Sequence, residues 1–226
     1  MSSLRFKPRV AFQGQPGAFS EDAAIELLGK DIALVSRATF VELFQSVDAQ
    51  VADYVLAPIE NSLAGAIQPC RDLLCQSRLV ITGEVIIPIA QQLIGVFGAS
   101  LEQIESVESH PVALAQCEKF FRLNPRLRRI EADDTAGSVA RIVRNGDFWR
   151  AAIAGNRAAA LYGGQILRAN IQDDEHNYTR FLLLSSAELI KQTGRRVLDD
   201  DHVEQKGPDA LRSFFVAASS QNETKR

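Results

Sequence analysis

A short run near the end of the chain brings together three kinds of side chain that bind ligands or transfer protons. Within residues 177–181 stand an amide at Asn177, a hydroxyl at Thr179 and a permanent cation at Arg180. The run begins in a polar segment and enters an apolar strand predicted over residues 179–184. By itself it specifies no reaction, and Arg180 has a structural alternative as a surface residue at a strand end.

Four further polar segments each follow a predicted strand, and most of them open a helix. In open α/β sheets, ligands bind beyond the carboxyl ends of the strands. Helix N-termini carry free N–H groups and a partial positive charge, so they attract anions without lysine. Several such junctions in a net-acidic chain indicate a site for a small carboxylate. The segments are 16–20, 60–62, 109–111 and 134–137.

Each of these polar residues also has a purely structural interpretation. Ser20, Ser109 and Thr135 are ordinary candidates for helix N-caps. Asn61 is a frequent turn residue after a strand, and Glu60 can pair with a nearby arginine. The pattern alone therefore predicts a small-molecule site in an α/β protein and leaves the reaction open.

The elements that must position these residues alternate between strand and helix. Such alternation favours a mainly parallel sheet covered by helices. Two helix starts carry a capping-box pattern, Thr39 with Glu42 and Ser100 with Gln103. The predicted strands are 10–13, 32–35, 54–59, 79–89, 93–97, 104–109, 151–154 and 179–184. The main predicted helices are 20–28 and 156–162, with others ending near 74 and beginning at 39, 111 and 135.

The bulk composition narrows the class of protein. A chain of 226 residues that is 46% hydrophobic can bury the core of one large domain or two small lobes. The formal net charge of −3 argues against a nucleic-acid binder, which usually carries a basic face. The chain contains no run of 18 apolar residues, so no membrane span is predicted. The first residues also lack the apolar core of a signal peptide. We expect a cytoplasmic enzyme or binding protein without a membrane partner.

Neither the cysteines nor the histidines have the spacing of a metal site. We expect the cysteines to be buried or half-buried free thiols and the histidines to be too scattered to hold a metal. These residues are Cys70, Cys75, Cys117, His110, His176 and His202. No metal site is predicted.

Seven sequence blocks, read in order, resemble the catalytic domain of prephenate dehydratases and of the closely related arogenate dehydratases. The resemblance runs through residues 9–184, and its blocks follow the order of the family, which makes it highly specific. The blocks are VAFQGQPGAFSEDAA (10–24), PIENSLAGAI (58–67), DLL with GEV (72–74 and 83–85), SHPVALAQC (109–117), DTAGS (134–138), AAIAGNRAAALYG (151–163) and IQDDEHNYTRF (171–181).

The resemblance implies a two-lobed, periplasmic-binding-protein-like α/β fold. Each lobe would be a mainly parallel sheet flanked by helices, with the active site in the interlobe cleft. The first lobe is expected over residues 1–83 plus 171–190, and the second over 84–170. Residues 191–226 are expected to form a polar tail, with one docking helix near 211–218 and no ACT regulatory domain. We therefore expect no built-in inhibition by phenylalanine; a homodimer is expected because relatives pair their catalytic domains.

The implied reaction is the loss of water and carbon dioxide from prephenate, which gives phenylpyruvate in phenylalanine biosynthesis. The family enzyme is a carbon–oxygen lyase that uses no cofactor. Thr179 would donate to the leaving hydroxyl, and Arg180 would bind a carboxylate, although the two side chains point to opposite faces of a regular strand. The implied catalytic residues are Thr179, Glu60 and Asn61. The implied substrate-binding residues are Ser20, Ser62, Ser109, Gln116, Thr135, Arg180 and Phe181.

Three residues depart from the pattern of the family and keep other functions open. Gln91 stands where many relatives have histidine, Val112 where glutamine is usual, and Gly164 where leucine is common. The first two put substrate preference in doubt more than reaction type. One alternative is an arogenate dehydratase, which converts arogenate to phenylalanine; another is a non-catalytic small-molecule sensor on the same scaffold.

Overall fold

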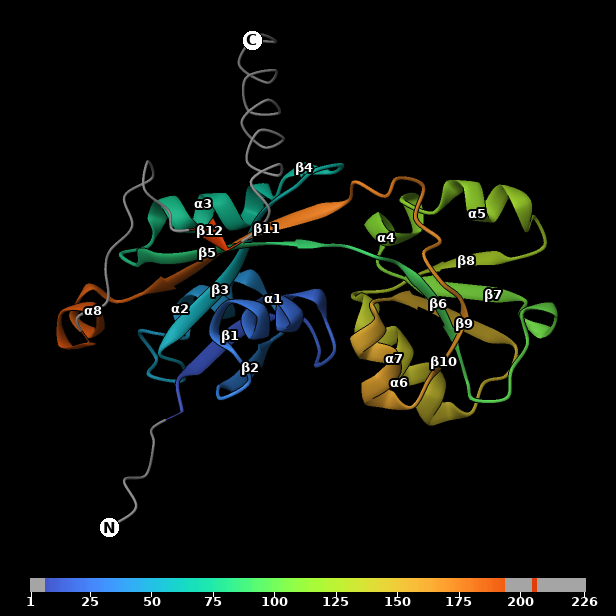
Figure 1. The fold of residues 1–226 in the computed structure, drawn as a ribbon, viewed down its shortest axis with the longest axis horizontal. Coiled ribbons are helices and arrows are strands. Elements are labelled where there is room, and N and C mark those ends of the chain that lie inside the picture. Colours follow the sequence, from blue (N-terminus) through green and yellow to red (C-terminus); the bar gives the residue numbers. More distant parts are fainter. Residues whose placement is uncertain (1–6, 194–204, 207–226) are drawn as a thin grey trace, which may run out of the picture. The chain divides into compact units, whose positions relative to one another are not determined.

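The computed structural model describes residues 7–193 and 205–206, and its contacts divide the chain into two compact units (Figure 1). Within the described residues, unit 1 comprises 7–13, 20–87, 178–193 and 205–206, and unit 2 comprises Gly14–Phe19 and Pro88–Asn177. The predictions for the first six residues and for residues 194–204 and 207–226, including the docking helix, lie outside the described residues. None of the described helices is long and apolar enough to cross a membrane.

Unit 1 is built on a mixed sheet with the order β12-β5-β11-β3-β1-β2, and β4 pairs with β3. The β1–β2, β1–β3 and β5–β12 pairs are parallel, whereas β3–β11 and β3–β4 are antiparallel. The strands are β1 Arg9–Gln13, β2 Ala33–Arg37, β3 Tyr54–Asn61, β4 Gly65–Ala66, β5 Val80–Pro88, β11 Tyr178–Ser185 and β12 Gln205–Lys206. The helices are α1 Phe19–Leu28, α2 Phe40–Gln45, α3 Gln68–Gln76 and α8 Ala187–Thr193.

The central strands of unit 1 are buried on both faces. Seven of the eight residues of β3 are buried, all except Glu60, as are the last five of β11. Leu182 and Leu184 pack in one cluster with Val55, Leu43 and other apolar residues of the unit. Burial of this continuous apolar surface fixes β11 beside β3, which is the pairing that positions the candidate site.

Unit 2 holds a second mixed sheet with the order β10-β6-β9-β7-β8. The β7–β8 and β7–β9 pairs are parallel, and the β6–β9 and β6–β10 pairs are antiparallel. The strands are β6 Gln92–Gly95, β7 Ser106–Ser109, β8 Arg128–Glu131, β9 Arg150–Ala154 and β10 Gln165–Arg168. The helices are η1 Leu101–Gln103, α4 Pro111–Ala115, α5 Glu118–Leu123, α6 Thr135–Asn145 and α7 Asn156–Tyr162.

The α/β class with helices flanking each sheet is confirmed, while both sheets contain more antiparallel pairing than we predicted. The strands β11 and β6 account for this, because each runs against a neighbouring strand of its own sheet. The single helix expected after residue 111 is divided into α4 and α5 at Gln116 and Cys117. Residues 171–177, which we assigned to the first lobe, make their contacts in unit 2, where Ile171 N donates to Gln91 O at 2.9 Å.

The predicted caps at Thr39 and Ser100 are both present. Thr39 Oγ1 accepts from Glu42 N at 3.1 Å and caps α2, and the Ser100–Gln103 capping box opens η1. Gly164, which departs from the pattern of the family, is explained by packing. A Cβ atom there would lie 2.6 Å from Ile94 Cγ2, so no larger residue fits without rearrangement.

Candidate functional site

The antiparallel pairing of β3 and β11 in unit 1 places Thr179 directly opposite Asn61. Both residues are buried, and Thr179 Oγ1 accepts a hydrogen bond from Asn61 Nδ2 at 3.0 Å. A threonine hydroxyl has one hydrogen to donate besides its acceptor lone pairs. Among the described residues nothing accepts that hydrogen. The hydroxyl is therefore held by its oxygen and is able to donate to a ligand.

Asn61 is itself fixed by the backbone around it. Its Nδ2 also donates to Tyr178 O at 3.0 Å, and its Oδ1 accepts from Leu63 N at 3.1 Å and Ala64 N at 2.8 Å. The asparagine thus forms the turn after β3 and orients the threonine at the same time. The turn role that the sequence suggested and the site role predicted from the resemblance are compatible.

Ser62 continues the same pairing past the end of β3. Its Oγ accepts from Tyr178 N at 2.9 Å, and its N donates to Tyr178 O at 2.9 Å. These bonds fix the start of β11, one residue before Thr179. We call Thr179, Asn61 and Ser62 the threonine cluster.

The next pair along the two strands, Arg180 opposite Glu60, faces the other side of the sheet because side chains alternate along a strand. Arg180 forms a bidentate ion pair with Glu84, with distances of 2.8 Å from Nε to Oε1 and 3.2 Å from Nη2 to Oε2. Glu84 is fully buried. The structure therefore brings Asn61 to Thr179, and it does not bring Glu60 or Arg180 there.

A register shift follows directly after Arg180, where Phe181 pairs with Pro58. Proline has no N–H to give to a sheet, so a central strand tolerates it at an irregularity of this kind. The Phe181 side chain is buried, with 2% of its surface exposed. The structure thus gives Phe181 a place in the core of unit 1.

Three predicted site residues lie at or just before the starts of helices, and none of them is the N-cap that the sequence suggested. The N-cap of α4 is His110, and Ser109 instead donates from its Oγ to Ile153 O at 2.7 Å, joining β7 to β9. The N-cap of α6 is Asp134, whose side chain accepts from Gly137 N, and Thr135 is the first helical residue. Ser20 is the second residue of α1 and is buried.

Gln116 is half-buried and bonds to two buried amides in unit 2. It is the C-cap of α4, and its Oε1 accepts from Gln91 Nε2 at 3.3 Å and from Asn177 Nδ2 at 2.9 Å. Gln91 is 2% exposed, and its own Oε1 is buried without a partner among the described residues. We call Gln91, Gln116 and Asn177 the glutamine cluster. The sequence marked Gln91 only as a departure from the family, and Val112 proves to be exposed on α4.

The neighbouring Gln92 shows how unusual the Gln91 oxygen is. Gln92 is equally buried, yet its Nε2 donates to Ala90 O at 3.1 Å and to Asn170 Oδ1 at 3.2 Å, and its Oε1 accepts from Asn170 N at 3.0 Å. A buried acceptor without a partner costs about 1–3 kcal/mol. Most buried polar groups avoid this cost, so each exception calls for an explanation.

The described residues contain no group of three or more His, Cys, Asp or Glu side chains that could hold a metal ion. Cys70 and Cys117 are buried free thiols, and burial raises the pKa of each to about 12. Two of the three predicted thiols are thus confirmed as buried, whereas Cys75 is exposed. The two buried thiols remain protonated and pack as small apolar groups.

Comparison with known proteins matches the chain to one family along most of its length. A family model described as prephenate dehydratase matches residues 10–189. The Arabidopsis thaliana protein named arogenate dehydratase/prephenate dehydratase 1, chloroplastic, is 42% identical over 189 residues, which are 84% of this chain and 48% of that protein. The chain spans about half the length of the curated relatives it matches.

Two solved structures share the fold. The prephenate dehydratase of Arthrobacter aurescens, in complex with L-Phe, is 28% identical with a TM-score of 0.73 over 79% of this chain and 60% of that one. GqqA, described as a novel type of quorum quenching acylase, is 32% identical with a TM-score of 0.71 over 79% of this chain and 64% of that one.

Proposed function

The chain belongs to the prephenate dehydratase family, and from that membership we propose that it catalyses the decarboxylating dehydration of prephenate to phenylpyruvate. This is a carbon–oxygen lyase reaction. The observation that carries the proposal is the buried Thr179 hydroxyl, whose oxygen is held by Asn61 and whose hydrogen is uncommitted among the described residues. It offers one oriented hydrogen-bond donor to a leaving oxygen.

The proposed chemistry breaks two bonds of the substrate and forms an aromatic ring. The electron pair of the bond between the ring and its carboxylate moves into the ring as carbon dioxide departs, and the C4–O bond breaks. The hydroxyl leaves and takes up a proton to become water. Thr179 is too weak an acid to ionise, so it donates a hydrogen bond or relays a proton to that oxygen. Positioned proton transfer contributes roughly 10²–10⁴-fold to rate.

The remaining predicted residues divide into supporting and binding roles. Asn61 positions the threonine, and we assign Arg180 to the support of the sheet because its guanidinium is bound to Glu84. Ser20 and Thr135 remain proposed substrate contacts, since helix N-termini favour carboxylates. Ser62 and Gln116 are also proposed to orient the substrate. Glu60 keeps only a proposed indirect role, because it faces away from Thr179.

The direct test follows the ultraviolet absorbance of phenylpyruvate after prephenate is added to the purified protein. We expect turnover in the wild type that needs no added cofactor. If neither prephenate nor arogenate is converted while one of them still binds, the alternative of a non-catalytic sensor is correct. Hydrolysis of acyl substrates in place of dehydration would instead align the chain with the activity named for GqqA.

A second candidate, arogenate dehydratase, is favoured by the unpartnered oxygen of Gln91. In the structure Gln116 Oε1 accepts from the amide nitrogens of Gln91 and Asn177, which leaves the Gln91 oxygen as the unpartnered atom among the described residues. Reversing the Gln91 amide alone would bring two carbonyl oxygens to 3.3 Å. In this arrangement the unpartnered atom is an acceptor and calls for a donor from the ligand.

The two candidate substrates differ in whether they carry such a donor. Arogenate carries an ammonium group where prephenate carries an oxo group, which only accepts hydrogen bonds. The C4 hydroxyl is a donor in both, but an acceptor placed on it would hold back a group that must gain a proton. We therefore propose that Gln91 Oε1 accepts from the ammonium of arogenate. Comparing kcat/KM for the two substrates decides between the candidates.

We also propose that the protein is a cytoplasmic homodimer without nucleic-acid or membrane partners. The negative net charge and the family resemblance support this proposal. Light scattering would give twice the chain mass of 24.8 kDa for a dimer. A monomer mass would contradict the homodimer. Recovery of the native protein with membranes on cell fractionation would contradict the cytoplasmic location without a membrane partner.

A further inference from the structure

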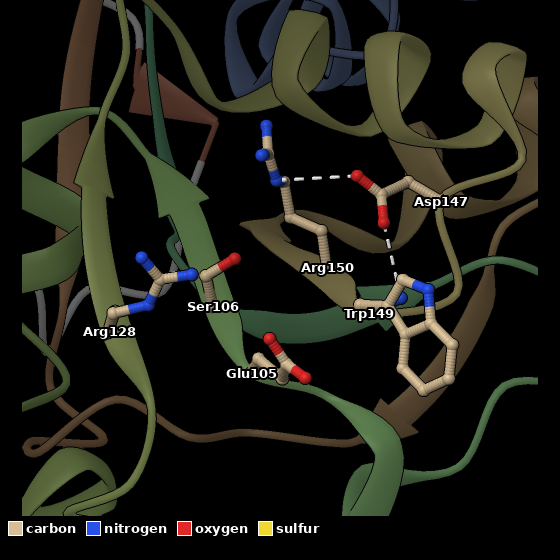
Figure 2. A pocket seen from close by; sticks show the side chains of 6 residues that line it. All are labelled: Glu105, Ser106, Arg128, Asp147, Trp149 and Arg150. Carbon is tan, nitrogen blue, oxygen red and sulfur yellow. Dashed lines mark hydrogen bonds and ion pairs between the residues drawn. The ribbon is translucent and has the colours of Figure 1, made fainter.

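Unit 2 contains a pocket at the edge of its sheet where the parallel strands β7, β8 and β9 begin (Figure 2). Its cavity of about 290 Å³ lies near the lower end of the range for small-molecule sites, roughly 300–1,000 Å³. The sequence had directed attention to the opposite, carboxyl ends of strands, where Ser109 lies. The lining residues are Glu105, Ser106, Arg128, Asp147, Trp149 and Arg150.

The charges of the lining are balanced in number but only partly paired. Arg150 lies 3.3 Å from Glu108 through Nη1 and 3.5 Å from Asp147 through Nε, as Figure 2 shows for the second contact. In contrast, the side chains of Arg128 and Glu105 have no ion pair or hydrogen bond within the described parts of the chain. One cation and one anion of the pocket are therefore available to a ligand.

The pocket also presents an aromatic surface on a fixed backbone. Trp149 is the only tryptophan of the chain, and 59% of it is exposed. Its N donates to Asp147 Oδ1 at 3.2 Å, and its O accepts from Glu105 N at 2.8 Å and from Ser106 N at 3.3 Å. An exposed indole on an anchored backbone offers a large apolar contact.

We propose that this pocket binds a small zwitterion, an α-amino acid with an apolar side chain. Arg128 would take the carboxylate, Glu105 the ammonium group, and Trp149 the apolar side chain. A simple anion would leave Glu105 without a partner, and a simple cation would leave Arg128 without one. Because charge-assisted hydrogen bonds are about twice as strong as neutral ones, a ligand that carries both charges is favoured.

The proposal does not depend on the proposed lyase activity, and Trp149 reports on it directly. Fluorescence of the single tryptophan is titrated with L-leucine and L-phenylalanine, and calorimetry repeats each titration. Leucine is compared with 3-methylbutylamine, which lacks its carboxylate, and with 4-methylpentanoate, which lacks its ammonium group. We expect saturable binding of at least one of the two amino acids and at least about tenfold weaker binding of both leucine analogues.

Matched variants locate the site. Arg128→Gln and Glu105→Gln should each weaken binding by about tenfold or more, because each removes one charge-assisted contact. Arg144→Gln makes the same change of charge as Arg128→Gln, at an exposed position outside the pocket lining, and should leave amino-acid binding unchanged. Three results would overturn the proposal: neither fluorescence nor heat changes with either amino acid, an analogue with a single charge binds as tightly as leucine, or both pocket variants bind normally.

Discussion

The threonine cluster of unit 1 and the glutamine cluster of unit 2 are both polar and each contains two buried residues and one half-buried residue, but they are held in different ways. In the first, Asn61 and Ser62 bond mainly to the backbone of two paired strands. In the second, the bonds that join Gln91, Gln116 and Asn177 run between side chains. A backbone-anchored group keeps one geometry, which suits a catalytic hydroxyl. Side-chain amides can reorient, which suits the recognition of alternative ligands.

The largest effect is expected from Thr179→Ala, which removes the proposed donor. Turnover should fall by roughly 10²–10⁴-fold, because positioned proton transfer has about that value. The Kd of the substrate should change by less than about tenfold, since only one neutral hydrogen bond is lost. Steady-state kinetics and calorimetry measure the two quantities. Thr179→Ser, which keeps a hydroxyl, is the matched control and should retain most of the turnover.

A loss of turnover in Thr179→Ala no larger than in Thr179→Ser would remove the threonine from the mechanism. The comparison between clusters would then also fail, because the backbone-anchored group would have no catalytic role. Circular dichroism of both variants must match the wild type, so that a folding defect is not mistaken for a chemical one.

The next largest effect tests the opposite face of the same strands. Arg180→Met should lower the free energy of unfolding by about 3–5 kcal/mol, because it leaves the fully buried Glu84 carboxylate without its cation. The double variant Arg180→Met with Glu84→Leu should recover much of that loss. Urea unfolding measures both. If Arg180→Met alone is as stable as the wild type, the ion pair does not contribute to stability. Arg180 would then again be a candidate to bind a substrate carboxylate.

The ion pair of Arg180 with Glu84 was only partly predictable from the sequence. The alternation of a strand predicted that Thr179 and Arg180 face opposite ways, which the structure bears out. The partner of Arg180 was missed because Glu84 lies 96 positions away, and only the sheet order brings β5 beside β11. A lone carboxylate in the apolar run 79–89 was the available signal, since a buried charge requires a partner.

The paired cap patterns, which depend on neighbouring residues, were predicted correctly, whereas the single-residue caps at Ser20, Ser109 and Thr135 were not. The caps at Thr39 and Ser100 follow from residues three positions apart, and both are present. The division between α4 and α5 was missed because no glycine or proline marks it. The unpartnered oxygen of Gln91 could not be predicted from the sequence either, because it depends on the contact that Gln91 and Asn177 make with Gln116 in the folded chain. Short-range patterns therefore specify elements, and long-range packing specifies which polar atoms remain available.

The glutamine cluster should affect the choice of substrate more than the rate of the common reaction. Gln91→Met keeps the length of the side chain and removes the acceptor. The ratio of kcat/KM for arogenate to that for prephenate should fall about 10- to 100-fold, because a hydrogen bond to a charged group contributes roughly 1.5–3 kcal/mol. Turnover of prephenate should change little. Parallel kinetics with both substrates give the ratio.

Two outcomes would contradict this role of Gln91. An equal loss with both substrates would mean that the oxygen contacts a group they share, and an unchanged ratio would mean that it contacts neither. Val112→Gln restores the residue usual in the family at an exposed position of the same unit and serves as a control that should leave the ratio unchanged.

The smallest effect concerns the hydrogen bond that orients the catalytic hydroxyl. Asn61→Asp keeps an oxygen for Leu63 N and Ala64 N but removes the amide donor to Thr179 Oγ1 and to Tyr178 O. The free energy of unfolding should fall by about 1–3 kcal/mol, because both of these hydrogen bonds are lost. Turnover should fall about 2- to 10-fold through the lost bond to Thr179, because one hydrogen bond contributes roughly 0.5–1.5 kcal/mol. Urea unfolding and steady-state kinetics separate the two effects. Unchanged turnover would mean that the strand backbone alone positions Thr179, so that the asparagine only closes the turn.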